Sequence, residues 1–161
     1  MLETARSHGV SSAGFLSCEA PSKQRLMIET YRGVVYPHQL DHMGHMNVQW
    51  YASKFDEATW HLFAAVGITN QYISESGNGM VALEQNNKYI AELMAGQLLV
   101  VRTRVVEVGE KTLRFLHTMY DAERESEVAT AELLGLHIDR SRRKSCPLPD
   151  AVRERAAELV T

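Results

Sequence analysis

Apolar residues recur at steps of three and four between Val48 and Val66, which is the spacing of one face of an α-helix. Asn47 precedes this stretch and Gly67 follows it, and these residue types often cap the start and the end of a helix. The apolar stripe consists of Tyr51, Ala52, Phe55, Thr59, Leu62, Phe63 and Val66. A helix with such a face needs a wide hydrophobic partner, so we expect it to be the central helix of the fold.

The other regular segments are dense in Val, Leu, Thr and aromatic residues, which favours β-strands. These segments are 26–36, 80–89, 97–108, 111–120 and 127–139. Residues 108–111 predict a tight hairpin, and a short helical pattern follows at 151–160. The order of elements predicts an α+β fold, in which a curved, mainly antiparallel five-stranded sheet wraps one long central helix.

The composition is that of one compact domain, because 161 residues with 45% hydrophobic content can bury a sizeable core. Residues 1–24 are rich in Ser, Ala, Gly and polar residues without periodicity, which predicts a disordered leader. We expect a single domain at 25–146 and a C-terminal helical tail at 147–161.

The charge balance gives no argument for a nucleic-acid partner, because the formal net charge is -3. No apolar stretch has the length to cross a membrane, and no signal-peptide core stands at the N-terminus. The two cysteines, Cys18 and Cys146, form no metal or redox motif. We therefore expect a cytoplasmic protein with free thiols and no membrane partner.

The segment between the first strand and the helix carries the candidate chemistry. It reads Asp41-His42-Met43-Gly44-His45-Met46-Asn47. A helix start presents backbone N–H groups without intrahelical acceptors and the positive end of a dipole, so it can stabilise an oxyanion. A carboxylate just upstream could act on a carbonyl group held there, which predicts an acyl-transfer site. Asp41 could instead be a turn residue that accepts hydrogen bonds from its own backbone.

Three histidines near Asp41 raise the alternative of a metal site: His38, His42 and His45. Pro37 and the glycine of the motif argue against a helix that would present them on one face, and no second ligand cluster supports it. We expect neither a metal nor a cofactor.

The motif resembles that of the hotdog-fold acyl-CoA thioesterases, in particular the 4-hydroxybenzoyl-CoA thioesterase subgroup. The matching residues are Asp41-x-x-Gly44-His45-x-Asn47, Tyr51 and Phe55, followed by the long helix and four strands. The resemblance covers about residues 31–139. It implies a hotdog fold, an acyl-CoA substrate and a site at a subunit interface. A homodimer is the smallest assembly it implies, and a homotetramer is common in the family.

The resemblance also implies roles for single residues. Asp41 matches the catalytic carboxylate, as nucleophile or as general base for water. The backbone N–H of Val48 matches the donor to the thioester carbonyl. Gly44, His45 and Asn47 match residues that hold the loop and the helix start.

Two further residues are candidates for the acyl pocket. Tyr51 belongs to the motif and to the apolar stripe, and Glu84 stands among Gln and Asn residues on a predicted strand. Glu84 could equally lie on an exposed strand edge or at a dimer seam. Glu57, where some enzymes of this fold place their carboxylate, falls opposite the apolar stripe and is expected in solvent.

Two alternatives to hydrolysis stay open. One is a hydratase or dehydratase acting on an enoyl or hydroxyacyl thioester, in which Asp41 and His45 would act together. The other is a non-catalytic acyl-CoA-binding domain. An intact Asp41 speaks against the second.

Overall fold

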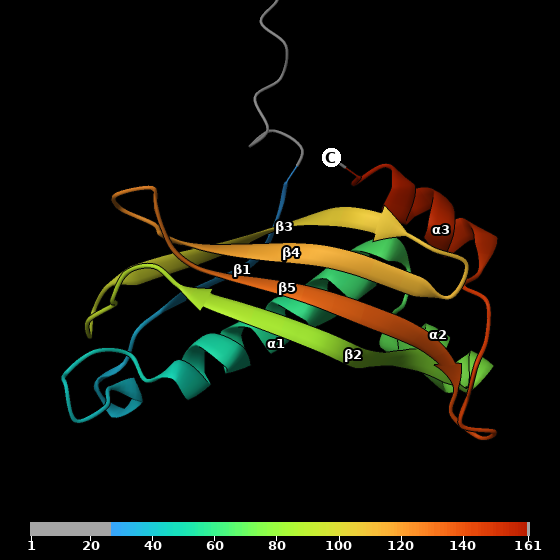
Figure 1. Cartoon of the computed structure of the whole chain (residues 1–161), viewed down its shortest axis with the longest axis horizontal. Helices are drawn as coiled ribbons and strands as arrows, with labels where there is room; N and C mark the ends of the chain where they lie inside the picture. The colour runs from blue at the N-terminus through green and yellow to red at the C-terminus, as the bar shows by residue number, and fades with distance from the viewer. Residues whose placement is uncertain (1–26, 161) are drawn as a thin grey trace, which may run out of the picture.

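A curved antiparallel sheet wraps one long helix in the computed structural model, which describes residues 27–160 (Figure 1). The leader expected at 1–24 lies outside these residues. The strands are β1 (Ile28–Val34), β2 (Asn78–Tyr89), β3 (Leu98–Val108), β4 (Thr112–Asp121), β5 (Ser126–Asp139) and the short β6 (Lys144–Ser145). The helices are α1 (Val48–Val66), α2 (Asn70–Ser76) and α3 (Asp150–Ala157), with a 3-10 turn at Pro37–Gln39. The predicted α+β fold is confirmed.

The long helix α1 begins and ends where its capping residues predict. Asn47 accepts a hydrogen bond from the Gln49 N–H at 3.0 Å, and Gly67 takes a left-handed conformation with φ of 100°. Most of the predicted apolar stripe is buried: Tyr51, Phe55, Thr59, Leu62 and Val66. None of the helices among residues 27–160 is long and apolar enough to cross a membrane.

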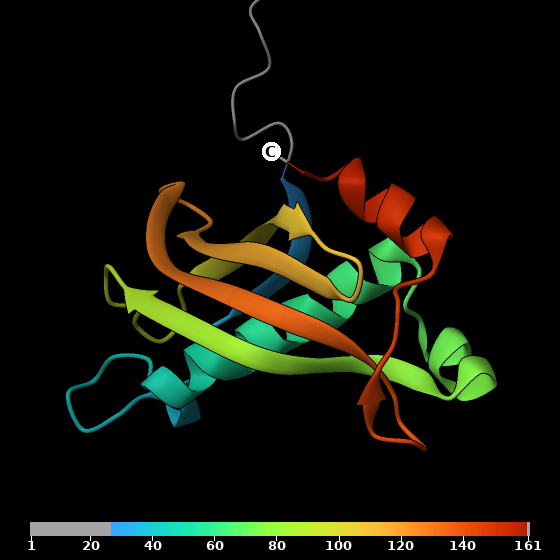
Figure 2. The same cartoon turned by 45° about the vertical axis from the view of Figure 1, so that its right-hand side comes forward.

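The strand order in the sheet is β1-β3-β4-β5-β2, and every pairing is antiparallel. Strands β3, β4 and β5 form a meander, while the two edges are β1 and β2. The short β6 pairs with the end of β5. Figure 2 shows α1 lying diagonally across the concave face of this sheet.

Two helical segments differ from the sequence prediction. Helix α2 was not predicted, because it has only seven residues and none of them is buried. Helix α3 ends at Ala157 rather than at 160, and Val160 instead forms an isolated parallel bridge with Val105 of β3. Val152 and Ala156 anchor α3 in the core.

A chain of polar side chains crosses the core between the sheet and α1. His117 lies between two threonines, with Nδ1 2.6 Å from Thr103 Oγ1 and Nε2 2.9 Å from Thr59 Oγ1. Thr103 Oγ1 lies 2.6 Å from Thr30 Oγ1. Burial lowers the pKa of His117 to about 3, so the ring is neutral, and the hydroxyls satisfy both of its nitrogens.

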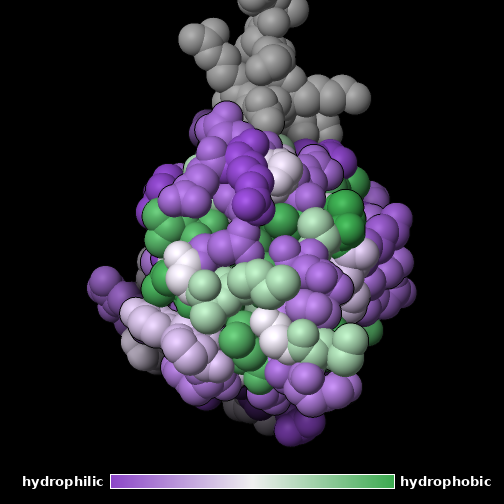
Figure 3. Space-filling view, turned by 90° about the vertical axis from the view of Figure 1, so that its left-hand side faces the viewer, coloured by the Kyte–Doolittle hydropathy of each residue, from purple (hydrophilic) through white to green (hydrophobic). Residues whose placement is uncertain are grey.

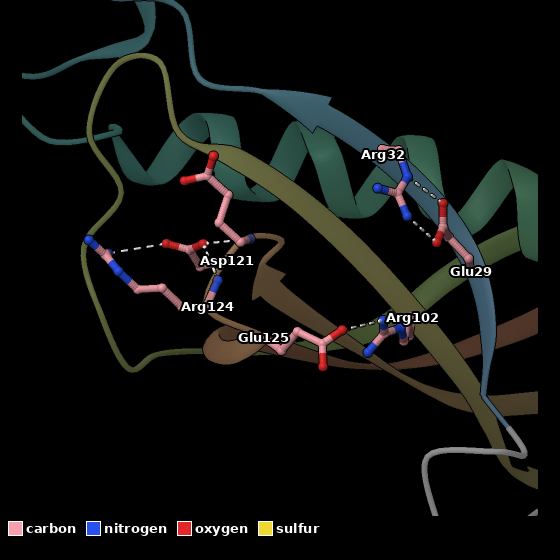
Figure 4. A network of polar contacts seen from close by, with 7 residues as sticks. Glu29, Arg32, Arg102, Asp121, Arg124 and Glu125 are labelled. Atoms are coloured by element: carbon pink, nitrogen blue, oxygen red, sulfur yellow. Dashed lines mark hydrogen bonds and ion pairs between the residues drawn. The ribbon is translucent and has the colours of Figure 1, made fainter.

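Polar contacts connect residues of β1, of β3 and of the turn between β4 and β5 (Figure 4). The Asp121 carboxylate accepts the backbone N–H groups of Arg124 and Glu123, which hold its pKa below the usual range and fix the turn between β4 and β5. Arg102 lies over the Tyr120 ring, 3.9 Å from Glu125. These contacts give Arg102 a structural role.

Candidate active site

The loop between β1 and α1 is closed by its own backbone. Leu40 and Met46 form an antiparallel bridge, and the Asp41 N–H donates to the His45 carbonyl at 2.9 Å. The Gly44 N–H donates to the Asp41 carbonyl at 3.1 Å, with Gly44 at φ of 85°. A positive φ of this size suits glycine. The residues from 41 to 45 therefore form one tight turn that ends beside the start of α1.

The Asp41 carboxylate has two different oxygens. Oδ1 accepts the Met43 N–H at 2.8 Å, which is the hydrogen bond of an Asx-turn. Among residues 27–160, no hydrogen bond to Oδ2 is found. The role of Asp41 as a turn residue thus involves one carboxylate oxygen only. The other oxygen, Oδ2, remains available for chemistry.

Val48 is the first residue of α1, where backbone N–H groups have no intrahelical acceptor. The next N–H, of Gln49, is taken by the Asn47 cap. The Val48 side chain is 56% exposed. The Val48 N–H thus lies at an exposed residue, at the positive end of the helix dipole.

Asp41 and Val48 line the same open cavity, of about 310 Å³. The complete lining is Asp41, His45, Met46, Val48, Tyr51, Tyr89, Ile90, Ala91 and Glu92. Figure 3 views the end of the molecule at which α1 begins, and it shows apolar surface between polar groups.

The far wall of this cavity comes from the end of β2 and the residues after it. The Met46 N–H donates to the Leu93 carbonyl at 2.7 Å, and the Tyr51 hydroxyl donates to the Ala91 carbonyl at 3.3 Å. The Tyr51 ring meets the Tyr89 ring edge to face, with centroids 5.3 Å apart. These contacts bring two segments about 40 residues apart in sequence into one site.

His45 and Glu92 both line the cavity and lie in contact, with Nε2 3.3 Å from Oε2. Burial raises the pKa of the Tyr51 hydroxyl, so this group stays protonated. Tyr89 and Glu92 were not among the predicted site residues. Their position at the end of a strand is the one signal that sequence offers, since such ends often carry functional loops.

Other candidate residues lie elsewhere. Glu84 is exposed on β2, 3.9 Å from Arg114, and does not line the cavity. Glu57 is exposed on α1, as expected. His38 packs edge to face against Trp50. Within residues 27–160, no three His, Cys, Asp or Glu side chains form a group that could hold a metal ion.

A second cavity, of about 390 Å³, lies at the other end of α1, between this helix, α2 and the sheet. Asp56, Trp60 and Phe63 line it from α1, while Met80 and Arg140 line it from the β2 and β5 side. It shares no lining residue with the cavity at Asp41.

The sequence pattern of the Thioesterase-like superfamily matches residues 35–156. The chain belongs to this superfamily. The match includes the turn at Asp41, the whole of α1 and the sheet from β2 to β5. The predicted family is therefore confirmed.

The names of two similar proteins refer to the same thioester, betainyl-CoA. The chain is 28% identical over 134 residues to the betainyl-CoA thioesterase of Pseudomonas aeruginosa, covering 83% of this chain and 84% of that protein. It is 29% identical over 113 residues to the L-carnitine dehydrogenase/betainyl-CoA thioesterase of Rhizobium meliloti. That match covers 70% of this chain and 23% of the longer protein, so the chain spans about a quarter of its length.

Solved structures share the fold. A Staphylococcus aureus protein determined in complex with CoA superposes with a TM-score of 0.77 at 19% identity, covering 83% of this chain and 84% of that one. A Pseudomonas putida protein, described as a candidate thioesterase, superposes with a TM-score of 0.71 at 26% identity. That superposition covers 83% of this chain and 85% of the other.

Proposed function

We propose that this protein hydrolyses an acyl-CoA thioester to the free acid and CoA, at the cavity lined by Asp41 and Val48. The observation that carries the proposal is the shared position of these two residues, a carboxylate and the first N–H of a helix, on one cavity. A thioester carbonyl is electrophilic and a thiolate is a good leaving group. One oxyanion donor and one carboxylate therefore suffice for the reaction.

The Val48 N–H donates a hydrogen bond to the thioester carbonyl oxygen and stabilises the negative charge that develops on it. Asp41 acts through the oxygen that the turn leaves free. As a general base, it takes a proton from water while the water oxygen attacks the carbonyl carbon. As a nucleophile, it forms a mixed anhydride that water then opens. In both routes the carbon–sulfur bond breaks, and the CoA thiolate leaves and takes up a proton.

The betaine thioester is the first substrate to examine, because the Pseudomonas aeruginosa and Rhizobium meliloti relatives are named for it. Its acyl group is small enough to enter an open cavity of about 310 Å³. The cytoplasmic location expected from the sequence stays a prediction.

We propose a homodimer that pairs β2 with β2 of a second copy. Within the described residues, β1 and β2 are the two edges of the sheet. The β1 edge carries the exposed Glu29–Arg32 ion pair at 2.8 Å (Figure 4), and such charges discourage edge pairing. The β2 edge instead exposes Val81, Leu83 and Tyr89. An unpaired edge with apolar residues is stabilised by a symmetric partner.

This pairing also relates the two cavities. Along β2, Tyr89 lies beside the start of α1, and Met80 lies beside its second half. Antiparallel pairing about a two-fold axis near the middle of β2 sets Tyr89 of one copy opposite the first residues of β2 in the other. The cavity at Asp41 would then face the second cavity of the partner.

The test is thiol release from a panel of acyl-CoAs, measured with a thiol reagent. We expect release with the wild type and its loss in Asp41→Asn, while Glu57→Gln, an exposed carboxylate outside both cavities, keeps wild-type rates. Loss of enoyl-CoA absorbance without thiol release would favour the hydratase alternative. Binding of acyl-CoA without turnover of any substrate would favour a binding domain, and either result would contradict the proposal.

A further inference from the structure

We propose that Tyr51, Tyr89 and Glu92 form a recognition site for a quaternary ammonium group carried by the acyl chain. This inference rests on the proposed thioesterase function and assigns a selective role to the far wall of the same cavity. None of the three residues performs the chemistry in this account. Their role is to choose which thioester reaches Asp41.

The charges around the cavity favour a cation. Asp41 and Glu92 contribute two carboxylates to its lining. Of the described residues that line it, none is a lysine or an arginine, and His45 is the single basic side chain. Its Nε2 lies 3.3 Å from Glu92 Oε2. With a neutral imidazole at His45, a positive group entering this space meets negative charge on two sides.

The two aromatic rings have the arrangement that suits such a group. Tyr51 and Tyr89 meet at an interplanar angle of 78°, so they form two walls of a corner. Tyr51 is buried and fixed through its bond to the Ala91 carbonyl, while Tyr89 is 49% exposed at the mouth. Quaternary ammonium groups bind against aromatic rings because the ring faces carry partial negative charge and the methyl groups need no hydrogen-bond partner.

The reach of a short acyl chain agrees with this placement. In an N-trimethylglycyl group the nitrogen is two bonds from the carbonyl carbon, a separation of about 2.5 Å. A carbonyl oxygen bound to the Val48 N–H therefore keeps the ammonium group inside the same cavity. The second cavity offers a weaker environment for a cation, because Asp56 shares its lining with Arg140.

The decisive comparison uses two thioesters of the same shape. N-Trimethylglycyl-CoA carries the ammonium group, and 3,3-dimethylbutanoyl-CoA replaces its nitrogen with carbon. We expect wild type to prefer the cationic thioester by about tenfold or more in kcat/KM. Glu92→Gln and Tyr89→Leu should lower this preference severalfold, mainly by raising KM for the cationic substrate. On the neutral thioester, both variants should lower kcat/KM much less than on the cationic one.

Three controls keep this test decisive. Glu57→Gln removes an exposed carboxylate outside the cavity and should keep the preference. Tyr89→Phe keeps the aromatic ring and should keep most of the preference for the cationic thioester. Sedimentation of each Tyr89 variant shows whether its oligomeric state is that of the wild type. Only Tyr89 variants with the wild-type oligomeric state enter the comparison. The result for Glu92→Gln does not depend on this selection.

The outcomes separate the two proposals. Asp41-dependent hydrolysis of both thioesters without a preference for the cationic one overturns this inference and leaves the proposed function intact. A preference that survives in Glu92→Gln and Tyr89→Leu also overturns it. Absence of thiol release from every acyl-CoA overturns both proposals.

Discussion

Oδ1 of Asp41 accepts a hydrogen bond from the backbone N–H of Met43 at 2.8 Å, so the proposed catalytic carboxylate also holds its own loop. The two roles can be separated by substitution. Asparagine keeps the Oδ1 acceptor, and alanine removes it. We predict that Asp41→Asn unfolds at the wild-type denaturant midpoint, while Asp41→Ala loses about 1 kcal/mol of unfolding free energy. Equal loss in both variants would show that charge rather than the turn stabilises the loop.

The buried ring of His117 predicts a pH dependence of stability. The folded protein keeps this ring neutral down to a pKa of about 3, whereas in the unfolded chain it protonates below about 6.5. Between these values the unfolded state binds more protons, so the unfolding free energy falls as pH falls. The loss attributable to His117 between pH 7 and pH 4 is about 3 kcal/mol. Urea titrations across this range measure it.

The matched comparison for that prediction is His117→Leu against His61→Gln. His61 is exposed on α1, so its replacement should leave the pH slope unchanged. His117→Leu should flatten the slope between pH 6.5 and 4, whatever its effect on absolute stability. An unchanged slope in His117→Leu would contradict the assignment.

The N-cap of α1 should matter for both stability and activity. Asn47→Ala removes the acceptor for the Gln49 N–H and should cost about 1 kcal/mol of unfolding free energy. Because the same helix start presents the Val48 N–H, kcat should fall as well. Thr69→Ala removes the equivalent cap of α2, where Thr69 accepts the Tyr72 N–H. That variant should lower stability and leave kcat unchanged.

Gly44 offers a test of loop geometry. It has φ of 85°, and a Cβ atom added there would meet no atom within 4 Å. The effect of Gly44→Ala is therefore conformational rather than steric, and we expect a stability loss of about 1 kcal/mol with a fall in thiol release. Gly77→Ala places the same strain after α2, at φ of 72° in open space. Its activity should stay at the wild-type level.

Local signals explain what the sequence could predict. The stripe and caps of α1 act within one helix, and the hairpin residues act between adjacent strands. The element order followed from these signals, and so did the family. Helix α2 was missed because seven residues without a buried side chain leave no periodic pattern. The end of α3 was missed because Val160 pairs with Val105, a contact between distant residues.

Some residues of the candidate site could likewise be predicted from local signals, and others could not. Asp41, Gly44, Asn47 and Val48 were predicted because their roles depend on one turn and one helix start. Tyr89 and Glu92 reach the cavity only through the bonds from Met46 to Leu93 and from Tyr51 to Ala91. No local pattern encodes these distant contacts. Glu84 stood out in sequence, yet the strand directs it to Arg114 instead.

The most direct test of the central claim is the turnover of Asp41→Asn on betaine thioester at saturating concentration, with CoA binding measured by calorimetry on the same sample. Asparagine keeps the turn and removes the ionisable oxygen. We predict that kcat falls by at least about 10²-fold while the affinity for CoA and the unfolding midpoint stay at wild-type values. A kcat within a few-fold of wild type would show that Asp41 is only a turn residue and would contradict the proposed mechanism.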